Sequence, residues 1–205
     1  GSSVTNVIVM VHSSIPNYHR RNSIRETYGS KTLFLPFKIR VVFLVGRPSN
    51  RNIQAAIESE SMKYRDMVQG DFFDSYHNLT HKAVMGLRWV TEHCQNSEWT
   101  LRVDDDVVFD MQLFLELFAS RLNPNNIHCC TINYPRVLRT GKWKVARNEF
   151  HGRKRYPWSY CPGFAAVFRS EMAKRLYRAA FVSPFFWIDD IYVYGILRHQ
   201  AKIQL

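Results

Sequence analysis

The sequence predicts an α/β fold in which a mostly parallel central sheet carries helices on both faces. Apolar, strand-like runs alternate with helix-like segments through the first two thirds of the chain, which is the order that produces a parallel sheet. Apolar residues make up 46% of the chain and charged residues 22%, as in ordinary soluble globular proteins. A length of 205 residues suffices for one domain with a substantial core. We therefore expect residues 1–205 to form a single domain.

Each element is predicted from its own residue pattern. Apolar runs predict strands at 4–12, 37–46, 66–72 and 98–106. Helical spacing and flanking turn residues predict helices at 17–29, which Gly29 closes, and at 50–62, 75–94 and 111–122. From Ile127 the pattern changes to short strands and turns, and helices return at 170–181 and 189–200.

The chain is strongly basic. It has 28 Lys and Arg against 17 Asp and Glu, a formal net charge of +11. Nucleic acid, an anionic membrane surface or a phosphorylated ligand could each explain this excess. The basic residues are scattered in pairs and no nucleic-acid motif is present, so the pattern disfavours a nucleic-acid partner. No apolar run reaches the roughly 20 residues of a membrane span.

The cysteines leave the redox state of the chain open. None of the four is spaced as CxxC, which argues against structural zinc and thioredoxin chemistry. Two disulfides and four buried thiols fit the count equally well. The four cysteines are Cys94, Cys129, Cys130 and Cys161.

The tripeptide NLT at Asn78 has two readings. It is an acceptor sequence for N-glycosylation. Asn78 and Thr80 also stand where a helix is expected to begin, and short polar side chains cap helix starts. The sequence leaves both readings open.

The stretch LRVDDDVVFD places three carboxylates at the end of a predicted strand. Ligands of open α/β sheets bind beyond the carboxyl ends of the strands. If the backbone stays extended, Asp104 and Asp106 point to one side and Asp105 to the other, so the first two would form a site for Mg²⁺ or Mn²⁺. The competing reading is a helix cap near Met111, a task for which Asp110 suffices.

Two further groups of charged residues could serve the same ligand. Arg21 and Arg25 stand four residues apart, on one helix face, and guanidinium groups suit diphosphate recognition, although a solvated basic face is the plainer reading. Asp189 and Asp190 lie between apolar residues, where a carboxyl has a raised pKa suited to a general base. Asp189 could instead cap the last helix, and Asp190 could be an ordinary first-turn acid.

Together these segments resemble the β-1,3-galactosyltransferase and β-1,3-N-acetylglucosaminyltransferase family, known as glycosyltransferase family 31. The resemblance covers nearly the whole chain, and it is specific because six motifs occur in the family's order. The motifs are RRNSIRETY, FLVG, GDFFDSYHNLTHKA, LRVDDDVVFD, YPWSYCPGFAAVFRS and IDDIYVYGIL.

The resemblance implies a GT-A type nucleotide-sugar-binding fold, a UDP-sugar donor, a Mn²⁺-type cation and inversion at the anomeric carbon. It implies transfer, with galactose expected first, to a hydroxyl of a glycan on a glycoprotein or glycolipid in a β-1,3 linkage. It also implies a type II membrane protein of the Golgi, with a luminal catalytic domain and a signal anchor upstream of this chain.

The family's site residues carry over by motif. Asp106 would hold the metal, and Asp104 would hold the metal through water or the ribose side of the nucleotide. Asp105 would lie among the donor-binding residues, Arg21 and Arg25 near the uridine diphosphate, and Asp74 near the nucleotide or sugar. Asp190 would be the base that deprotonates the acceptor hydroxyl.

The chain departs from the family at several positions. Tyr28 stands where Trp is usual, Asp189 where Glu is commoner, and Pro162 and Ala165 where many members have glycine, which predicts a differently shaped acceptor loop. The family's late metal-binding His is expected past Leu205, so we expect this chain alone to turn over weakly or not at all.

Two alternatives stay open. The transferred sugar could be N-acetylglucosamine or N-acetylgalactosamine, which pocket shape alone would distinguish. The chain could instead be a nucleotide-sugar-binding or lectin-like module without turnover. That reading requires Asp190 to lie far from the acidic triplet.

Overall fold

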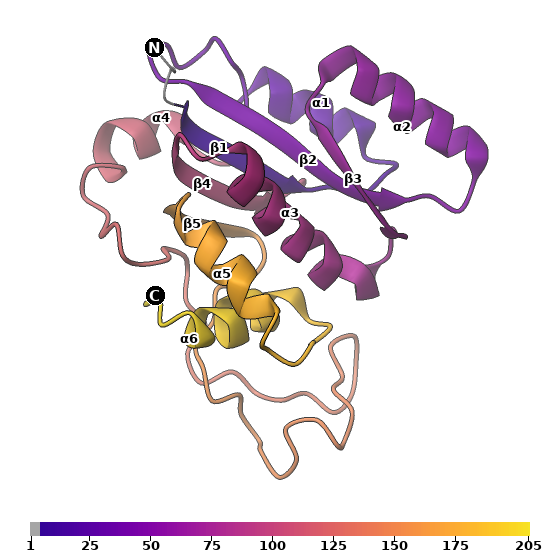
Figure 1. Cartoon of the computed structure of the whole chain (residues 1–205), viewed down its shortest axis with the longest axis vertical. Coiled ribbons are helices and arrows are strands. Elements are labelled where there is room, and N and C mark those ends of the chain that lie inside the picture. The colour runs from indigo at the N-terminus through magenta and orange to yellow at the C-terminus, as the bar shows by residue number, and fades with distance from the viewer. Residues whose placement is uncertain (1–4) are drawn as a thin grey trace.

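A computed structural model describes residues 5–205, so Val4, which the sequence assigns to the first strand, lies outside the described residues. The sheet has five strands in the order β3-β2-β1-β4-β5 (Figure 1). β1 to β4 run parallel, and β5 pairs with β4 in the antiparallel direction. The predicted mostly parallel sheet is confirmed. The strands are β1 (Thr5–His12), β2 (Ile39–Arg47), β3 (Met67–Phe73), β4 (Ser97–Asp104) and β5 (Ala165–Arg169).

The helices follow the predicted order. They are α1 (Tyr18–Glu26), α2 (Arg51–Tyr64), η1 (Tyr76–Asn78) with α3 (Leu79–His93), α4 (Met111–Leu113) with η2 (Phe114–Phe118), α5 (Met172–Ala180), and η3 (Ile191–Leu197) with α6 (Arg198–Gln200). The helix predicted at 111–122 is wrong at its end, since it stops at Phe118. Its last turn widens, with the Ala119 N–H donating to Phe114 O, and a turn of this kind does not propagate as an α-helix.

Residues of β1 alternate between two cores, one on each face of the sheet. Ile8 and Met10 pack with α3, α5 and η3, whereas the odd-numbered residues of β1 pack with α1 and α4. Figure 1 shows α3 and α5 together on one side of the sheet. Helices therefore cover both faces, as the sequence predicts. Across the described part of the chain, every helix is too short or too polar to cross a bilayer.

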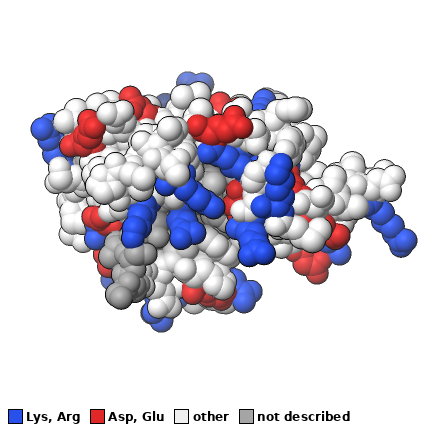
Figure 2. All heavy atoms as spheres, turned by 90° about the horizontal axis from the view of Figure 1, so that it is seen from above, with Lys and Arg blue, Asp and Glu red and all other residues white. Residues whose placement is uncertain are grey.

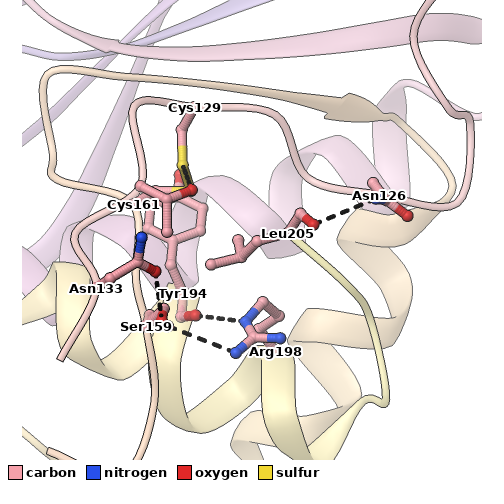
Figure 3. The surroundings of a disulfide bond; sticks show 9 residues. Asn126, Cys129, Asn133, Ser159, Cys161, Tyr194, Arg198 and Leu205 are labelled. Atoms are coloured by element: carbon pink, nitrogen blue, oxygen red, sulfur yellow. Dashed lines mark hydrogen bonds between the residues drawn. A yellow bond between two sulfur atoms is a disulfide. The ribbon is translucent and has the colours of Figure 1, made fainter.

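A long irregular segment joins Asn126 to β5 and extends away from the sheet, in the salmon and orange part of Figure 1. A disulfide between Cys129 and Cys161 links the two ends of this segment (Figure 3). Cys94 is a buried free thiol whose pKa burial raises to about 11, and Cys130 is an exposed free thiol. Neither two disulfides nor four thiols is correct, because the cysteines divide into one bridge and two free residues.

Candidate active site

Asp104 and Asp190 line one cavity of about 570 Å³ beyond the carboxyl end of β4. Asp104 is the last residue of that strand, and Asp190 immediately precedes η3. Arg102, Asp189 and Gly163 line the same cavity. The two acidic groups, distant in sequence, therefore share a cleft. The alternative of a binding module without turnover required Asp190 to lie far from the acidic triplet, and the shared cavity counts against it.

The Asp190 carboxylate is poised between its charged and neutral forms. Burial, followed by the neighbouring charge of Asp189, raises the pKa of Asp190 to about 7. Its Oδ1 atom is buried and has no hydrogen-bond partner among the described residues. Gly163 allows this placement, because a Cβ atom at that position would lie 2.5 Å from Asp190 Oδ1. Asp190 thus has the pKa and the free oxygen that a general base needs.

Asp189 has a different task from its neighbour. Its Oδ2 accepts a hydrogen bond of 3.0 Å from Arg102, whose Nη2 also donates to His12 Nδ1 at 2.9 Å. Burial, then the charge of Arg102, lowers the pKa of His12 well below its ordinary value, so the imidazole is neutral. Asp189 is therefore one partner of a buried Arg–carboxylate pair that forms part of the cavity lining.

Asp104 is the part of the acidic triplet that reaches the cavity. Its side chain is 41% exposed and its Oδ1 lies 3.2 Å from Arg102 Nη2. Burial raises the pKa of Asp104 to about 6, although Arg102 opposes the shift. Arg102 Nη1 is buried and lacks a partner among the described residues, and a Cβ atom at Gly163 would lie 2.9 Å from it.

Both carboxylate oxygens of Asp105 accept hydrogen bonds from other residues of the protein. Its Oδ2 accepts from Ser13 Oγ at 2.8 Å and from the Ser14 N–H at 3.1 Å, and Asn17 and Arg20 donate to the same carboxylate. The side chain is only 7% exposed. These bonds join the end of β4 to the start of α1. Asp105 therefore supports the site in this structure, and its predicted donor contact stays a prediction.

The predicted alternation fails at the end of β4. The strand ends at Asp104, and Asp105 and Asp106 form a turn, so Asp106 lines a second hollow of about 700 Å³ with Arg20 and Tyr28. The Asp106 side chain is 60% exposed, and its Oδ2 lies 3.4 Å from Arg20 Nη1. The cap expected near Met111 is confirmed, because Asp110 accepts a hydrogen bond from the Leu113 N–H.

The donor chemistry of the triplet fits a hard divalent cation. With Asp105 saturated by N–H and O–H donors, Asp104 and Asp106 offer exposed carboxylate oxygens. Within residues 5–205, no cluster of three or more His, Cys, Asp and Glu side chains could hold a metal ion. Two carboxylates match a cation that takes its other ligands from water and substrate phosphates.

Arg21 and Arg25 lie on one helix face, as predicted, and that face is turned inward. Both donate to Glu60, and Arg25 also donates to Asp66. The Arg21 side chain is 1% exposed, and it donates to Ser13 Oγ and Ser14 O, the loop that holds Asp105. The solvated-face reading is wrong. Contact with uridine diphosphate stays a prediction, and the geometry gives both residues a supporting role.

Asp74 follows the end of β3 and is not among the residues that line the cavity of Asp190, so its predicted contact with the nucleotide or sugar stays a prediction. Its Oδ1 accepts from Lys82 Nζ at 2.8 Å, and its Oδ2 accepts from the Gly46 N–H at 3.1 Å. A Cβ atom at Gly46 would lie 2.9 Å from the Asp74 backbone nitrogen, so this approach requires glycine. Lys82 Nζ also donates to Ser13 O at 2.7 Å, which connects Asp74 to the network around Asp105.

The cap reading of Asn78 and Thr80 is wrong. Asn78 is the first flanking residue of α3 but makes no side-chain cap bond, and its amide donates to Phe73 O instead. Thr80 is buried and donates to Phe186 O, which fixes the start of α3 against the segment that leads to Asp189. Glycosylation of Asn78 stays a prediction.

Sequence reasoning overlooked Arg102, His12 and Lys82. Arg102 was read only as a strand residue, yet a single charged residue within the apolar run of β4 is itself a signal of a buried ion pair. Lys82 carried a similar signal, because it stands among the apolar positions of α3. Nothing in the sequence distinguishes His12 from an ordinary strand end.

Comparison with known proteins agrees with this arrangement. The family described as Galactosyltransferase matches residues 19–205. The chain is 28% identical over 198 residues to beta-1,3-galactosyltransferase 1 of Homo sapiens and of Mus musculus, covering 94% of this chain and 60% of each relative. It is 29% identical over 205 residues to beta-1,3-galactosyltransferase 5 of Mus musculus, covering 97% of this chain and 64% of that relative. The chain thus spans less than two thirds of these relatives.

The matched region contains every residue of the shared cavity, from Tyr76 to Ile191. The mostly parallel five-stranded sheet with helices on both faces is consistent with a GT-A-like glycosyltransferase fold. With 19–205 matched, the chain belongs to the galactosyltransferase family.

Proposed function

We propose that this chain is the catalytic domain of an inverting, UDP-sugar-dependent hexosyltransferase that forms a β-1,3 linkage to a glycan hydroxyl. Galactose is the sugar that the relatives' names favour. One observation carries the proposal: a carboxylate with a pKa of about 7 and an unpartnered oxygen lies in the same cavity as the end of the acidic triplet. A binding module has no need of such a group.

In the proposed reaction the carboxylate of Asp190, which lines the cavity, accepts the proton of an acceptor hydroxyl. The hydroxyl oxygen forms a bond to the anomeric carbon on the face opposite the diphosphate. The bond from that carbon to the phosphate oxygen breaks, and its electron pair leaves with UDP. One direct displacement inverts the carbon and needs only one base, and Asp190 is the carboxylate of this cavity that would serve.

The remaining residues would position the reactants. Arg102 lines the cavity, has a buried Nη1 without a partner among the described residues, and holds Asp189 at the same time. Asp104 and Asp106 would hold a divalent cation, Mn²⁺ in this proposal, which when bound supplies Lewis-acid stabilisation of the leaving diphosphate.

We also propose that the domain works in the Golgi lumen, attached through a membrane anchor outside this chain. Two observations support this. The Cys129–Cys161 disulfide is of a kind that persists in oxidising compartments. The relatives are longer than this chain, which covers 60% to 64% of them.

A donor screen tests the proposal. UDP release from UDP-galactose, UDP-N-acetylglucosamine and UDP-N-acetylgalactosamine is measured with and without Mn²⁺, together with calorimetric binding of UDP. We expect Mn²⁺-dependent UDP binding that Asp106→Ala abolishes and that Asp71→Ala, a change at an exposed carboxylate that lines neither hollow of the acidic triplet, preserves. UDP binding that ignores both Mn²⁺ and Asp106→Ala would remove the metal assignment.

A further inference from the structure

The positive charge of the chain is concentrated in the segment between Cys129 and Cys161. That segment contains eight Lys and Arg residues and one acidic residue, Glu149, so it carries +7 of the total net charge of +11. Figure 2 views the molecule from above, where a group of basic side chains lies across the middle of the face and acidic ones lie mostly around it. The sequence reading of scattered basic pairs therefore describes only part of the molecule.

The segment is a built structure. The disulfide joins its two ends (Figure 3), and backbone hydrogen bonds from Val137 to Lys154 O and from Tyr156 to Pro135 O pair its two arms. Val137, Val145 and Tyr156 are buried in the same core as α3 and α5. These anchors fix the backbone from which the basic side chains project.

The segment encloses a cavity of about 830 Å³ whose charged lining residues are all basic. The side chains of Arg136, Arg147 and Arg153 have no ion pair or hydrogen bond with the described residues. Arg139 and Arg155 instead donate to backbone carbonyls of the segment. The basic cavity is lined by Arg136, Arg139, Arg147, Arg153, Lys154 and Arg155. Clustered cations without carboxylate partners create a strong local positive potential.

This basic cavity adjoins the active site. Arg136 and Leu138 line both the basic cavity and the cavity that contains Asp190. On the active-site side the wall is aromatic, with Trp143 Nε1 donating to Tyr76 Oη and Lys142 Nζ 4.1 Å from the centre of the Tyr76 ring. A chain of sugar rings with its reacting hydroxyl at Asp190 would pass these rings and then meet the arginines.

We propose that the acceptor is an anionic glycan, whose carboxylate or sulfate groups bind the basic cavity while its terminal sugar lies at Asp190. The assignment of this ligand as acceptor rests on the proposed transferase function. Arginine forks suit carboxylate and sulfate oxygens, and aromatic rings suit the apolar faces of sugars. A nucleic acid is less well matched, because the basic side chains surround a pocket beside the cavity of Asp190 and do not form an extended stripe along the surface.

Binding without a donor tests this inference separately from transfer. The probes are an unsulfated chondroitin hexasaccharide, its sulfated form and its carboxyl-reduced, neutral form, titrated by calorimetry into the 205-residue chain at about 50 mM and about 200 mM salt. We expect both anionic forms to bind, the neutral form to bind at least about tenfold more weakly, and affinity to fall with salt. The ratio of the two anionic forms tells whether carboxylate or sulfate dominates.

A pair of charge-matched variants locates the site. Arg147→Glu with Arg153→Glu should weaken hexasaccharide binding by about tenfold or more and leave UDP affinity unchanged. Lys31→Glu with Lys174→Glu makes the same change in net charge at exposed residues outside the segment and should alter binding by less than about twofold.

Three results would overturn the inference. They are equal binding of the neutral hexasaccharide, equal loss in both variants, and tighter binding of a single-stranded oligonucleotide of the same charge. Anionic glycan binding without any Mn²⁺-dependent UDP binding would instead leave the inference standing and count against the proposed function.

Discussion

Two pairs of adjacent aspartates, one at the end of β4 and one at the start of the last helix, divide in the same way. Asp105 and Asp189 are held by donors from other elements, Asp105 by Ser13 and its neighbours and Asp189 by Arg102. Asp104 and Asp190 face the shared cavity, and burial raises the pKa of each. One carboxylate of each pair supports the site, and the other is left available to a ligand.

The Asp189–Asp190 pair teaches that bonding, more than burial, can separate the two roles. The Asp190 Oδ1 atom is buried, as is the carboxylate of Asp189, yet only the second has a guanidinium donor. A buried carboxylate with few hydrogen-bond donors favours its neutral form, whereas one that accepts several N–H or O–H bonds is stabilised in its charged form. Four predictions test this contrast.

The largest effect is expected at Asp190. Asp190→Asn keeps the shape of the side chain and removes the proton acceptor, so transfer should fall by about a thousandfold while UDP affinity stays the same. Transfer by the unchanged protein should also decline as pH falls below about 7, because the base becomes protonated. Steady-state rates across pH measure both, in a full-length luminal form of the protein because this chain alone is expected to turn over weakly or not at all. A variant with full transfer activity would exclude Asp190 as the base.

Asp105 should matter next, and through stability. Asp105→Ala deprives Ser13 Oγ, the Ser14 N–H and the Asn17 amide of their acceptor, so the free energy of unfolding should fall by about 3 kcal/mol. Asp106→Ala is the matched control, since that side chain is exposed, and should cost less than about 1 kcal/mol. Urea titrations give both values. Equal losses would show that the network around Asp105 adds no stability of its own.

The sequence predicted the frame of the fold better than the details of the site. Apolar runs and helical spacing depend on local patterns, so the strands, their parallel pairing and the helices on both faces could be predicted. The roles within each aspartate pair could not, because they depend on partners distant in sequence. Asp105 meets Ser13, and Asp189 meets Arg102, only after the sheet has formed. The disulfide partner of Cys161 was undetermined for the same reason.

The inward turn of α1 shows the same limit. The four-residue spacing of Arg21 and Arg25 correctly predicted a common face, but spacing does not say what that face contacts. Glu60 and Asp66, the carboxylates that hold these arginines, lie in α2 and just before β3. The face of α1 that carries Arg21 and Arg25 is buried because these distant carboxylates pair with it, and the local sequence does not reveal them.

A third effect is the loss of folding stability that follows from the raised pKa of Asp190. The folded-state pKa of about 7 exceeds the ordinary 3.8, so stability is highest while the group is protonated and declines as pH rises from about 4 through about 7. Asn cannot ionise, so Asp190→Asn should unfold with a free energy about 2 kcal/mol higher than the unchanged protein near pH 7.5, and with little difference near pH 4. Urea titrations in EDTA at both pH values check this. A gain that is equal at both would show that charge is not its cause.

The smallest effect is expected at Asp110, the last carboxylate of LRVDDDVVFD. Like Asp105 and Asp189, Asp110 accepts a hydrogen bond from another residue, although it does not line the cavity. Its Oδ1 accepts from the Leu113 N–H at 2.9 Å and caps α4. Asp110→Ala should lower the free energy of unfolding by about 1 kcal/mol, and Asp110→Asn, which keeps the acceptor, by a few tenths at most. Neither change should affect UDP binding. If Asp110→Asn cost as much as Asp110→Ala, the helix start would require the charge of Asp110 and not its hydrogen bond. Hydrogen bonding would then no longer distinguish the supporting aspartates from those that face the cavity.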